Sequence, residues 1–242
     1  MLVEPSPSLG GQPGTEYNFP RPQRVRQSKV PQRVAVSVQQ LFRMLDYHVV
    51  AFGGSVTALR DRALITCCYF GLFRSSEIIG VHACARGDVR FVVEDGIERV
   101  EMPLRRSKAD PFGKGSLAVV GASGGRHCGV RYLHAYLDAT AHLPATSALF
   151  ANAARNSPSS TYFNRLLKTL GGAVGMTVRG LSAHSLRHGM ATALIVANGS
   201  CRDLVLLAGR WSPRSTAADV YFHARGLRLA RTAVLVTRAI GA

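Results

Sequence analysis

The segment that decides the fold is residues 184–192, HSLRHGMAT. At helical spacing His184 and Arg187 lie on one face, and His188 lies one turn after His184. Two histidines four residues apart also occur in zinc proteases, but no Glu stands at the expected place and Arg187 would repel a metal cation. We therefore reject a zinc site. A His-x-x-Arg pair can instead hold a phosphate, with a bidentate guanidinium and an imidazole that donates or accepts.

A second motif follows at residues 207–213, LAGRWSP, and Tyr221 comes ten residues after Trp211. Trp211 is the only tryptophan of the chain, which has seven tyrosines. Taken alone, packing in the core explains both aromatic residues.

Upstream, residues 71–77 read GLFRSSE. Arg74 stands between an apolar helix and the next helix, where an unpaired guanidinium would be costly. It needs an anionic partner. That partner is Glu77 at i+3, an external anion, or both, with Glu77 then orienting Arg74.

Residues 105–115, RRSKADPFGKG, form a basic turn between two expected strands. Lys108 is one of four lysines among thirty basic residues. Arg keeps its proton near neutral pH whereas Lys can release one, so Lys108 is a candidate proton donor. Taken alone, a surface lysine on a hairpin is the better interpretation.

In this order, the four segments resemble the tyrosine recombinases, the phage-integrase superfamily, over roughly residues 36–225. Gly-Arg-Trp at 209–211 resembles the mobile-element branch of that family. The resemblance implies DNA recombination, integration or transposition by a site-specific recombinase.

The resemblance also assigns roles. Tyr221 would attack a DNA phosphodiester, leaving a 3′-phosphotyrosine and a free 5′-hydroxyl. Arg74 and Arg187 would hold the phosphoryl oxygens, and Lys108 would protonate the leaving oxygen. His184 would assist proton transfer from Tyr221. The catalytic set is Arg74, Lys108, His184, Arg187, Trp211 and Tyr221.

The resemblance also assigns supporting and DNA-binding roles to other residues. It implies that the reaction needs no metal and no cofactor. Trp211 would buttress the phosphate through packing and its indole N–H. The supporting residues are Glu77, His188 and Arg210. The expected DNA-binding residues are Arg105, Arg106, Lys114 and Arg214.

Hydrophobic periodicity independently predicts the fold class: mainly α with a small three-stranded antiparallel β-sheet, an α+β arrangement. Ser37 and Gln40 predict a helix start, Val38, Leu41, Phe42 and Leu45 its apolar face, and Gly53-Gly54 a break. A buried helix is expected over Ser55–Phe73 and a short one through Ile79. The expected strands are Asp88–Val93, Ile97–Leu104 and Ser116–Val120. Further helices are expected at 128–141, 159–171, 183–198, 201–208, 215–223 and 226–239.

Composition favours a polyanionic partner. The 242 residues carry a formal net charge of +16, with a pI near 10.7. The last 104 residues hold twelve Arg or Lys and two acidic residues. Charge of one sign over this length favours a phosphate-facing surface, with double-stranded DNA as the expected partner.

The sequence excludes several other classes of protein. No apolar stretch is long enough to span a membrane, and residues 1–14 have no signal-peptide core. Five cysteines, an odd number, indicate buried reduced thiols, not a disulfide framework. We expect an intracellular, DNA-associated protein, in the nucleus if the source is eukaryotic.

Three regions are expected along the chain: a flexible basic Pro/Gly-rich tail (1–34), a catalytic domain (35–224) and a C-terminal helix (225–242). The helix either packs on its own domain or is exchanged between protomers of a DNA-bound tetramer. Many relatives carry an N-terminal DNA-clamping domain, so the chain is a fragment or its clamp is missing or supplied by another chain.

Two other functions stay open. One is a catalytically inactive DNA-binding remnant of a mobile-element recombinase. The other is a type IB topoisomerase-like enzyme, which shares the tyrosine chemistry without needing a synapse.

Overall fold

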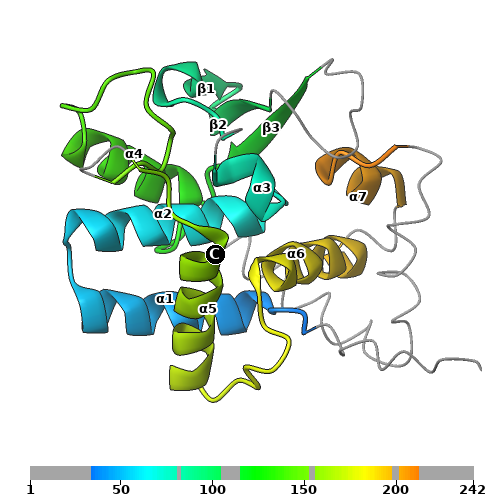
Figure 1. The fold of residues 1–242 in the computed structure, drawn as a ribbon. Helices are drawn as coiled ribbons and strands as arrows, with labels where there is room; N and C mark the ends of the chain where they lie inside the picture. The colour runs from blue at the N-terminus through cyan, green and yellow to red at the C-terminus, as the bar shows by residue number, and fades with distance from the viewer. Residues whose placement is uncertain (1–33, 81–82, 105–114, 153–155, 198–201, 213–242) are drawn as a thin grey trace, which may run out of the picture. The chain divides into compact units, whose positions relative to one another are not determined.

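The computed structural model describes residues 34–80, 83–104, 115–152, 156–197 and 202–212 (Figure 1). The chain divides into two units, Met1–Val30 and Pro31–Ala242, and every described residue belongs to the second. The tail up to residue 33, the expected helices at 215–223 and 226–239, and the C-terminal region 225–242 lie outside the described residues.

The first helix, α1 (Val38–Phe52), begins with the expected capping box. The backbone N–H of Gln40 donates to Ser37 Oγ at 3.1 Å, and the Ser37 N–H donates to Gln40 Oε1 at 2.9 Å. The helix ends at Gly53, whose φ of 60° is left-handed and suits glycine. Helix start and break are therefore confirmed.

The apolar face of α1 is rotated slightly from the expected one. Val38, Leu41 and Leu45 are buried, whereas Phe42 is only partly buried. Met44 and His48 complete the buried face in its place.

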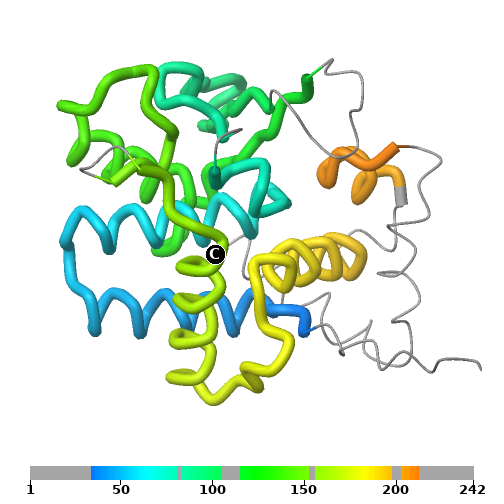
Figure 2. Tube along the Cα trace, in the orientation of Figure 1, coloured from blue at the N-terminus to red at the C-terminus, as the bar shows by residue number. Residues whose placement is uncertain are grey.

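The second helix, α2 (Val56–Phe70), is capped by Ser55 and ends three residues before the expected Phe73. Leu72 adopts a left-handed φ of 47°, which an α-helix cannot continue through. The short helix α3 (Ser75–Ile78) follows as expected. Figure 2 shows α1 and α2 running antiparallel and joined at Gly53-Gly54.

The three strands are β1 (Arg90–Glu94), β2 (Ile97–Leu104) and β3 (Ser116–Gly121), paired antiparallel in the order β1-β2-β3. Asp95 and Gly96 have φ values of 52° and 74°, as a two-residue hairpin turn requires. A single 3-10 turn at Arg86–Asp88 occupies the start of the expected first strand. Val100 and Met102 of β2 face the core, together with Ala118 of β3.

The remaining described helices are α4 (Gly129–Ala139), α5 (Ser160–Ala173), α6 (Ala183–Ala197) and α7 (Arg202–Ala208). Each lies within two residues of its expected bounds. The expected fold class, mainly α with a three-stranded antiparallel sheet, is confirmed.

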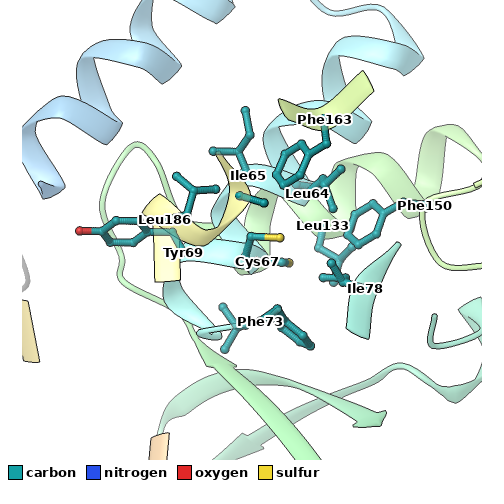
Figure 3. Close-up of a cluster of buried hydrophobic side chains, with 14 of the residues drawn as sticks. Leu64, Ile65, Cys67, Tyr69, Phe73, Ile78, Leu133, Phe150, Phe163 and Leu186 are labelled. Atoms are coloured by element: carbon teal, nitrogen blue, oxygen red, sulfur yellow. The ribbon is translucent and has the colours of Figure 1, made fainter. Parts of the chain in front are cut away.

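The core is organised around α2, which is buried on nearly every side and packs most extensively against α4. Figure 3 shows Leu64, Ile65 and Cys67 of α2 meeting Leu133 of α4 and Phe163 of α5. Because α2 is held on all sides, the turn that follows it has a fixed place in the molecule.

The backbone before α1 packs directly against α6. The Val36 N–H donates to the Ser185 carbonyl at 3.1 Å, and a Cβ on Gly189 would lie 1.8 Å from the Val36 carbonyl oxygen. Only glycine permits this close approach.

Burial raises the pKa of the Cys67 thiol to about 12 and that of Cys68 well above its ordinary value. The four described cysteines are free and buried, as expected for reduced thiols. None of the described helices combines the length and apolarity needed to cross a bilayer.

Candidate active site

The turn between α2 and α3 carries the main-chain groups around which the site is built. Gly71 caps α2, and a Cβ there would lie 2.4 Å from the Phe73 ring and 2.8 Å from the Cys67 carbonyl oxygen. Leu72, only 1% exposed, follows in the left-handed region. The turn presents its main-chain carbonyl groups to the side chains of Arg187 and Arg210.

Arg74 and Glu77 form the expected pair across α3. Arg74 Nη1 lies 2.6 Å from Glu77 Oε1, and the Arg74 backbone N–H donates to Glu77 Oε2 at 2.8 Å. The Arg74 side chain is 24% exposed, whereas that of Glu77 is 1% exposed. Glu77 is thus a buried carboxylate that orients a partly exposed guanidinium.

Arg187 reaches the α2–α3 turn from α6, 115 residues after Leu72. Its Nη1 donates to the Leu72 carbonyl and its Nη2 to the Gly209 carbonyl, the latter at 2.6 Å. Nη1 also lies 4.0 Å from Glu77 Oε2. Arg187 is the largest fully buried side chain among the described residues.

The segment after α7 closes the site. The Arg187 Cζ lies 4.2 Å from the centroid of the Trp211 ring, a cation–π contact. A Cβ on Gly209 would lie 1.7 Å from that ring, so Gly209 makes room for the indole. Trp211 therefore covers Arg187, whereas Arg210 contacts Glu77.

That residue, Arg210, turns toward the α2–α3 turn. Its Nη2 lies 2.9 Å from Glu77 Oε2 and donates to the Leu72 carbonyl at 3.1 Å. Its Nη1 donates to the Gly71 carbonyl at 2.8 Å. Three guanidinium groups from separate parts of the sequence thus converge on Glu77.

This cluster has more positive than negative charge. Burial raises the pKa of the Glu77 carboxyl, but Arg210 and the N–H groups of Arg74 more than offset it, so the pKa lies below its ordinary value. Burial lowers the pKa of Arg210 even though Glu77 opposes the shift. One carboxylate facing three guanidinium groups leaves an anion-binding potential in a low-dielectric setting.

The other expected site residues are not all in this cluster. His184 is exposed on the first turn of α6, three residues before Arg187, and His188 is partly buried one turn later. Six expected residues lie outside the described part of the chain: Arg105, Arg106, Lys108, Lys114, Arg214 and Tyr221. Within the described part, no three His, Cys, Asp or Glu side chains lie together in a metal-binding group.

Main-chain carbonyl groups are part of this site, which the residue types alone do not indicate. The Leu72 carbonyl accepts hydrogen bonds from both Arg187 and Arg210. The Phe73 ring lies 5.1 Å from the Arg210 guanidinium. No residue-type signal marks a carbonyl group as a ligand, although the glycine before Leu72 is a hint of a sharp turn.

Comparison with known proteins agrees with this fold. Residues 35–227 match the model of the phage integrase family. The chain is 30% identical over 199 residues to tyrosine recombinase XerD of Bifidobacterium longum, covering 78% of this chain and 57% of that protein. It is 28% identical over 169 residues to XerD of Xanthomonas campestris pv. campestris, covering 67% and 48%. The chain spans about half the length of these relatives.

Two solved structures share the fold. One is the XerH site-specific recombinase bound to palindromic difH substrate in a post-cleavage complex, with a TM-score of 0.63 and 21% identity, covering 83% of this chain and 52% of that chain. The other is an FLP recombinase–Holliday junction complex, with a TM-score of 0.53 and 15% identity, covering 82% and 49%. The match of the family model over most of the sequence, on a fold shared with these recombinases, shows that the chain belongs to the phage integrase family of tyrosine recombinases.

Proposed function

We propose that this chain breaks and rejoins double-stranded DNA as a site-specific recombinase through a 3′-phosphotyrosine intermediate. The observation that carries the proposal is the convergence of Arg74, Arg187 and Arg210 on the single buried carboxylate of Glu77. Glu77 can neutralise only one of the three guanidinium charges, which leaves a surplus of two positive charges. A phosphodiester brings one negative charge, and its transition state adds another, so the cluster stabilises the transition state more than the substrate.

In the proposed reaction the Tyr221 oxygen forms a bond to phosphorus and the bond from phosphorus to the 5′-oxygen breaks. The phenol proton leaves with help from His184, and Lys108 gives a proton to the departing 5′-oxygen. The phosphotyrosine keeps the energy of the broken bond, so a second 5′-hydroxyl reverses the step without a nucleotide cofactor or a metal.

Arg74 and Arg187 would hold the non-bridging oxygens. Trp211 would seat Arg187 by its cation–π contact, with its ring centroid 4.2 Å from the Arg187 Cζ. Glu77 would orient Arg74 through the 2.6 Å contact. His188, next to Arg187 on α6, would support it. Arg105, Arg106, Lys114 and Arg214 would neutralise neighbouring DNA phosphates.

The partners follow the same logic. XerH is described with its difH substrate and FLP recombinase with a Holliday junction. For this chain we propose a homotetramer on DNA, with residues 225–242 exchanged between protomers and the 1–34 tail lying along the phosphate backbone. The Gly-Arg-Trp sequence at 209–211 favours an origin in a mobile element. The proposed DNA partner implies a DNA-associated location in the cell.

The test is covalent trapping. The protein is incubated with a randomised pool of nicked duplexes, in which the short 5′-fragment diffuses away after cleavage, and products are separated on a denaturing gel. Wild-type protein should give a DNA adduct that Tyr221→Phe abolishes. An adduct that persists in Tyr221→Phe removes Tyr221 as the nucleophile.

The same experiment separates the alternatives. Salt-dependent DNA binding without any adduct favours the inactive remnant. Adducts followed by relaxation of a supercoiled plasmid by a monomer favour the topoisomerase-like enzyme. Lys108→Arg should slow cleavage, and a 5′-phosphorothiolate, whose leaving group needs no acid, should restore the rate.

A further inference from the structure

Arg210 has an unusual place for an arginine. The backbone N–H of Trp211 donates to the Leu206 carbonyl at 2.9 Å, and the backbone N–H of Arg210 donates to the Leu207 carbonyl at 3.0 Å. These two bonds form the Schellman motif that ends α7, and Arg210 stands at the position where glycine is preferred. Its φ of 54° costs about 1–2 kcal/mol for a residue with a Cβ.

The side chain explains why an arginine serves at this position. Both of its Nη atoms are occupied by protein groups: the carbonyl oxygens of Gly71, Leu72 and Ala208, and Glu77 Oε2. The side chain is 10% exposed. Its Nε is buried without a hydrogen-bond partner among the described residues. The guanidinium therefore directs its Nη donors to the α2–α3 turn, to Ala208 and to Glu77.

Glu77 divides its two oxygens between two arginines. Oε1 contacts Arg74 Nη1, whereas Oε2 contacts the Arg74 backbone N–H and Arg210 Nη2. The next cation is Arg187, 4.0 Å from Oε2. If Arg210 were absent, the Glu77 carboxylate would draw Arg187 closer, and Arg187 would leave the position that its bonds to the Leu72 and Gly209 carbonyl groups define.

We propose that Arg210 is a positioning residue: it neutralises Glu77 and holds the Gly71–Leu72 carbonyl groups, which leaves the charges of Arg74 and Arg187 available for the scissile phosphate. Arg210 itself touches no DNA. The inference rests on the proposed function, since it names what prepares that site for its anion. Arg210 also joins the end of α7, which precedes Tyr221 in the sequence, to the α2–α3 turn that leads into Arg74.

The central variant is Arg210→Asn, because asparagine tolerates the left-handed backbone that ends α7. Arg165→Asn, on an exposed face of α5, is the matched control for the loss of one charge. Arg210→Lys tests rescue by a cation that can reach Glu77 but cannot bridge the carbonyl groups. Circular dichroism checks that each variant is folded.

Binding and cleavage are measured separately, on a nicked duplex recovered from the trapping experiment. Arg210→Asn should bind DNA within about twofold of Arg165→Asn with an equal salt dependence. It should form the adduct about 100-fold more slowly, as a displaced reacting group does. Arg210→Lys should recover about tenfold of that loss. A weaker Kd with a salt slope reduced by about one would make Arg210 a phosphate ligand and overturn the proposal, as would an unchanged rate.

A double variant tests the path through Glu77. If Arg210 acts through this carboxylate, adding Arg210→Asn to Glu77→Gln should slow cleavage by less than about threefold more. Losses that multiply in full would overturn the proposed path.

Sulfate binding separates this proposal from the function itself. In apo protein, sulfate should raise the free energy of unfolding of the wild type, and Arg210→Asn should lose most of that gain while Arg165→Asn keeps it. If wild type forms no adduct yet shows this sulfate response, the proposed function fails and the positioning role stands. An equal sulfate response in Arg210→Asn overturns the positioning role whatever the cleavage result.

Discussion

Two clusters of buried charge in this molecule differ in their balance. Around Glu77, three guanidinium groups share one carboxylate. Between α2 and α5, Arg60 pairs with Asp61 at 2.9 Å, and the Tyr162 hydroxyl donates to the other Asp61 oxygen at 2.6 Å. The second cluster is neutral, with both charged side chains under 10% exposed.

The difference lies in whether the buried charges are balanced within the protein. The Asp61 cluster satisfies its own charges, and burial together with the Asp61 hydrogen bond raises the pKa of Tyr162 to about 12. It needs nothing from outside the protein. The Glu77 cluster keeps surplus positive charge at the cost of desolvation, which is reasonable only if an anion completes it.

The largest expected effect sets Arg187 against Arg60. Arg187→Lys keeps a cation but loses the bidentate geometry, so the rate of covalent adduct formation should fall by about 10²–10³-fold. Arg60→Lys should leave that rate within about twofold of wild type. Single-turnover trapping on the nicked duplex measures both. Equal losses would erase the distinction between the clusters.

A second test breaks the balanced cluster. Asp61→Asn leaves Arg60 as an uncompensated buried charge and should lower the free energy of unfolding by about 3 kcal/mol, measured by urea denaturation. Tyr162→Phe, which removes one hydrogen bond, should cost about 1 kcal/mol. Cleavage per folded molecule should persist in both variants. A cleavage loss as large as that of Arg187→Lys would mean that the Asp61 cluster also serves catalysis.

Sulfate sharpens the comparison further. At a concentration tenfold above its Kd, sulfate should add about 1.4 kcal/mol to the free energy of unfolding, compared with chloride at equal ionic strength. Arg74→Gln should lose this specific gain, because it removes the most exposed guanidinium of the Glu77 cluster. Tyr162→Phe should retain it. A gain that survives Arg74→Gln would reflect the general stabilising effect of sulfate instead.

The smallest effect is a difference in pH response. Burial lowers the pKa of His48 below 6.5, although nearby Asp61 opposes the shift. The unfolded chain therefore binds a proton first, and stability is lost as pH falls from about 6.5 toward the folded pKa. The loss is about 1 kcal/mol for each pH unit between the unfolded and folded pKa values. His48→Gln should remove this loss. Unfolding curves between pH 7 and 5 provide the measurement, and an unchanged slope in His48→Gln would contradict it.

The Glu77 cluster should respond at lower pH. The pKa of Glu77 lies below its ordinary value of 4.5, so its stabilising contribution is complete above that pH and is lost as pH falls through the folded pKa. The stability linked to His48 and that linked to Glu77 are thus lost in separate pH windows.

Local signals predicted much of the fold. Ser37 and Gln40 predicted the start of α1, because helix caps depend on neighbouring residues. The end of α2 was not predictable in this way. The apolar run continues through Leu72 and Phe73, but Leu72 turns left-handed where its carbonyl accepts bonds from Arg187 and Arg210.

The site was predictable in its residue types more than in its connections. Arg74 and Glu77 stood out because an unpaired guanidinium would be costly, and Arg187 stood out because a His-x-x-Arg pair can hold a phosphate. The sharing of Glu77 with Arg210 was not visible, because it joins residues 133 positions apart through a left-handed turn. The proposed places of Lys108 and Tyr221 stay predictions, since both lie outside the described residues.

The contact between Gly189 and Val36 has a mechanical consequence. The backbone entering α1 rests on α6 with no side chain between them, within one turn of Arg187, the proposed phosphate ligand. Because no side chain separates the two backbones, the chain entering α1 cannot move toward α6 without displacing the helical turn that carries Arg187. A Cβ at position 189 would therefore disturb both the start of α1 and the backbone on which Arg187 is held.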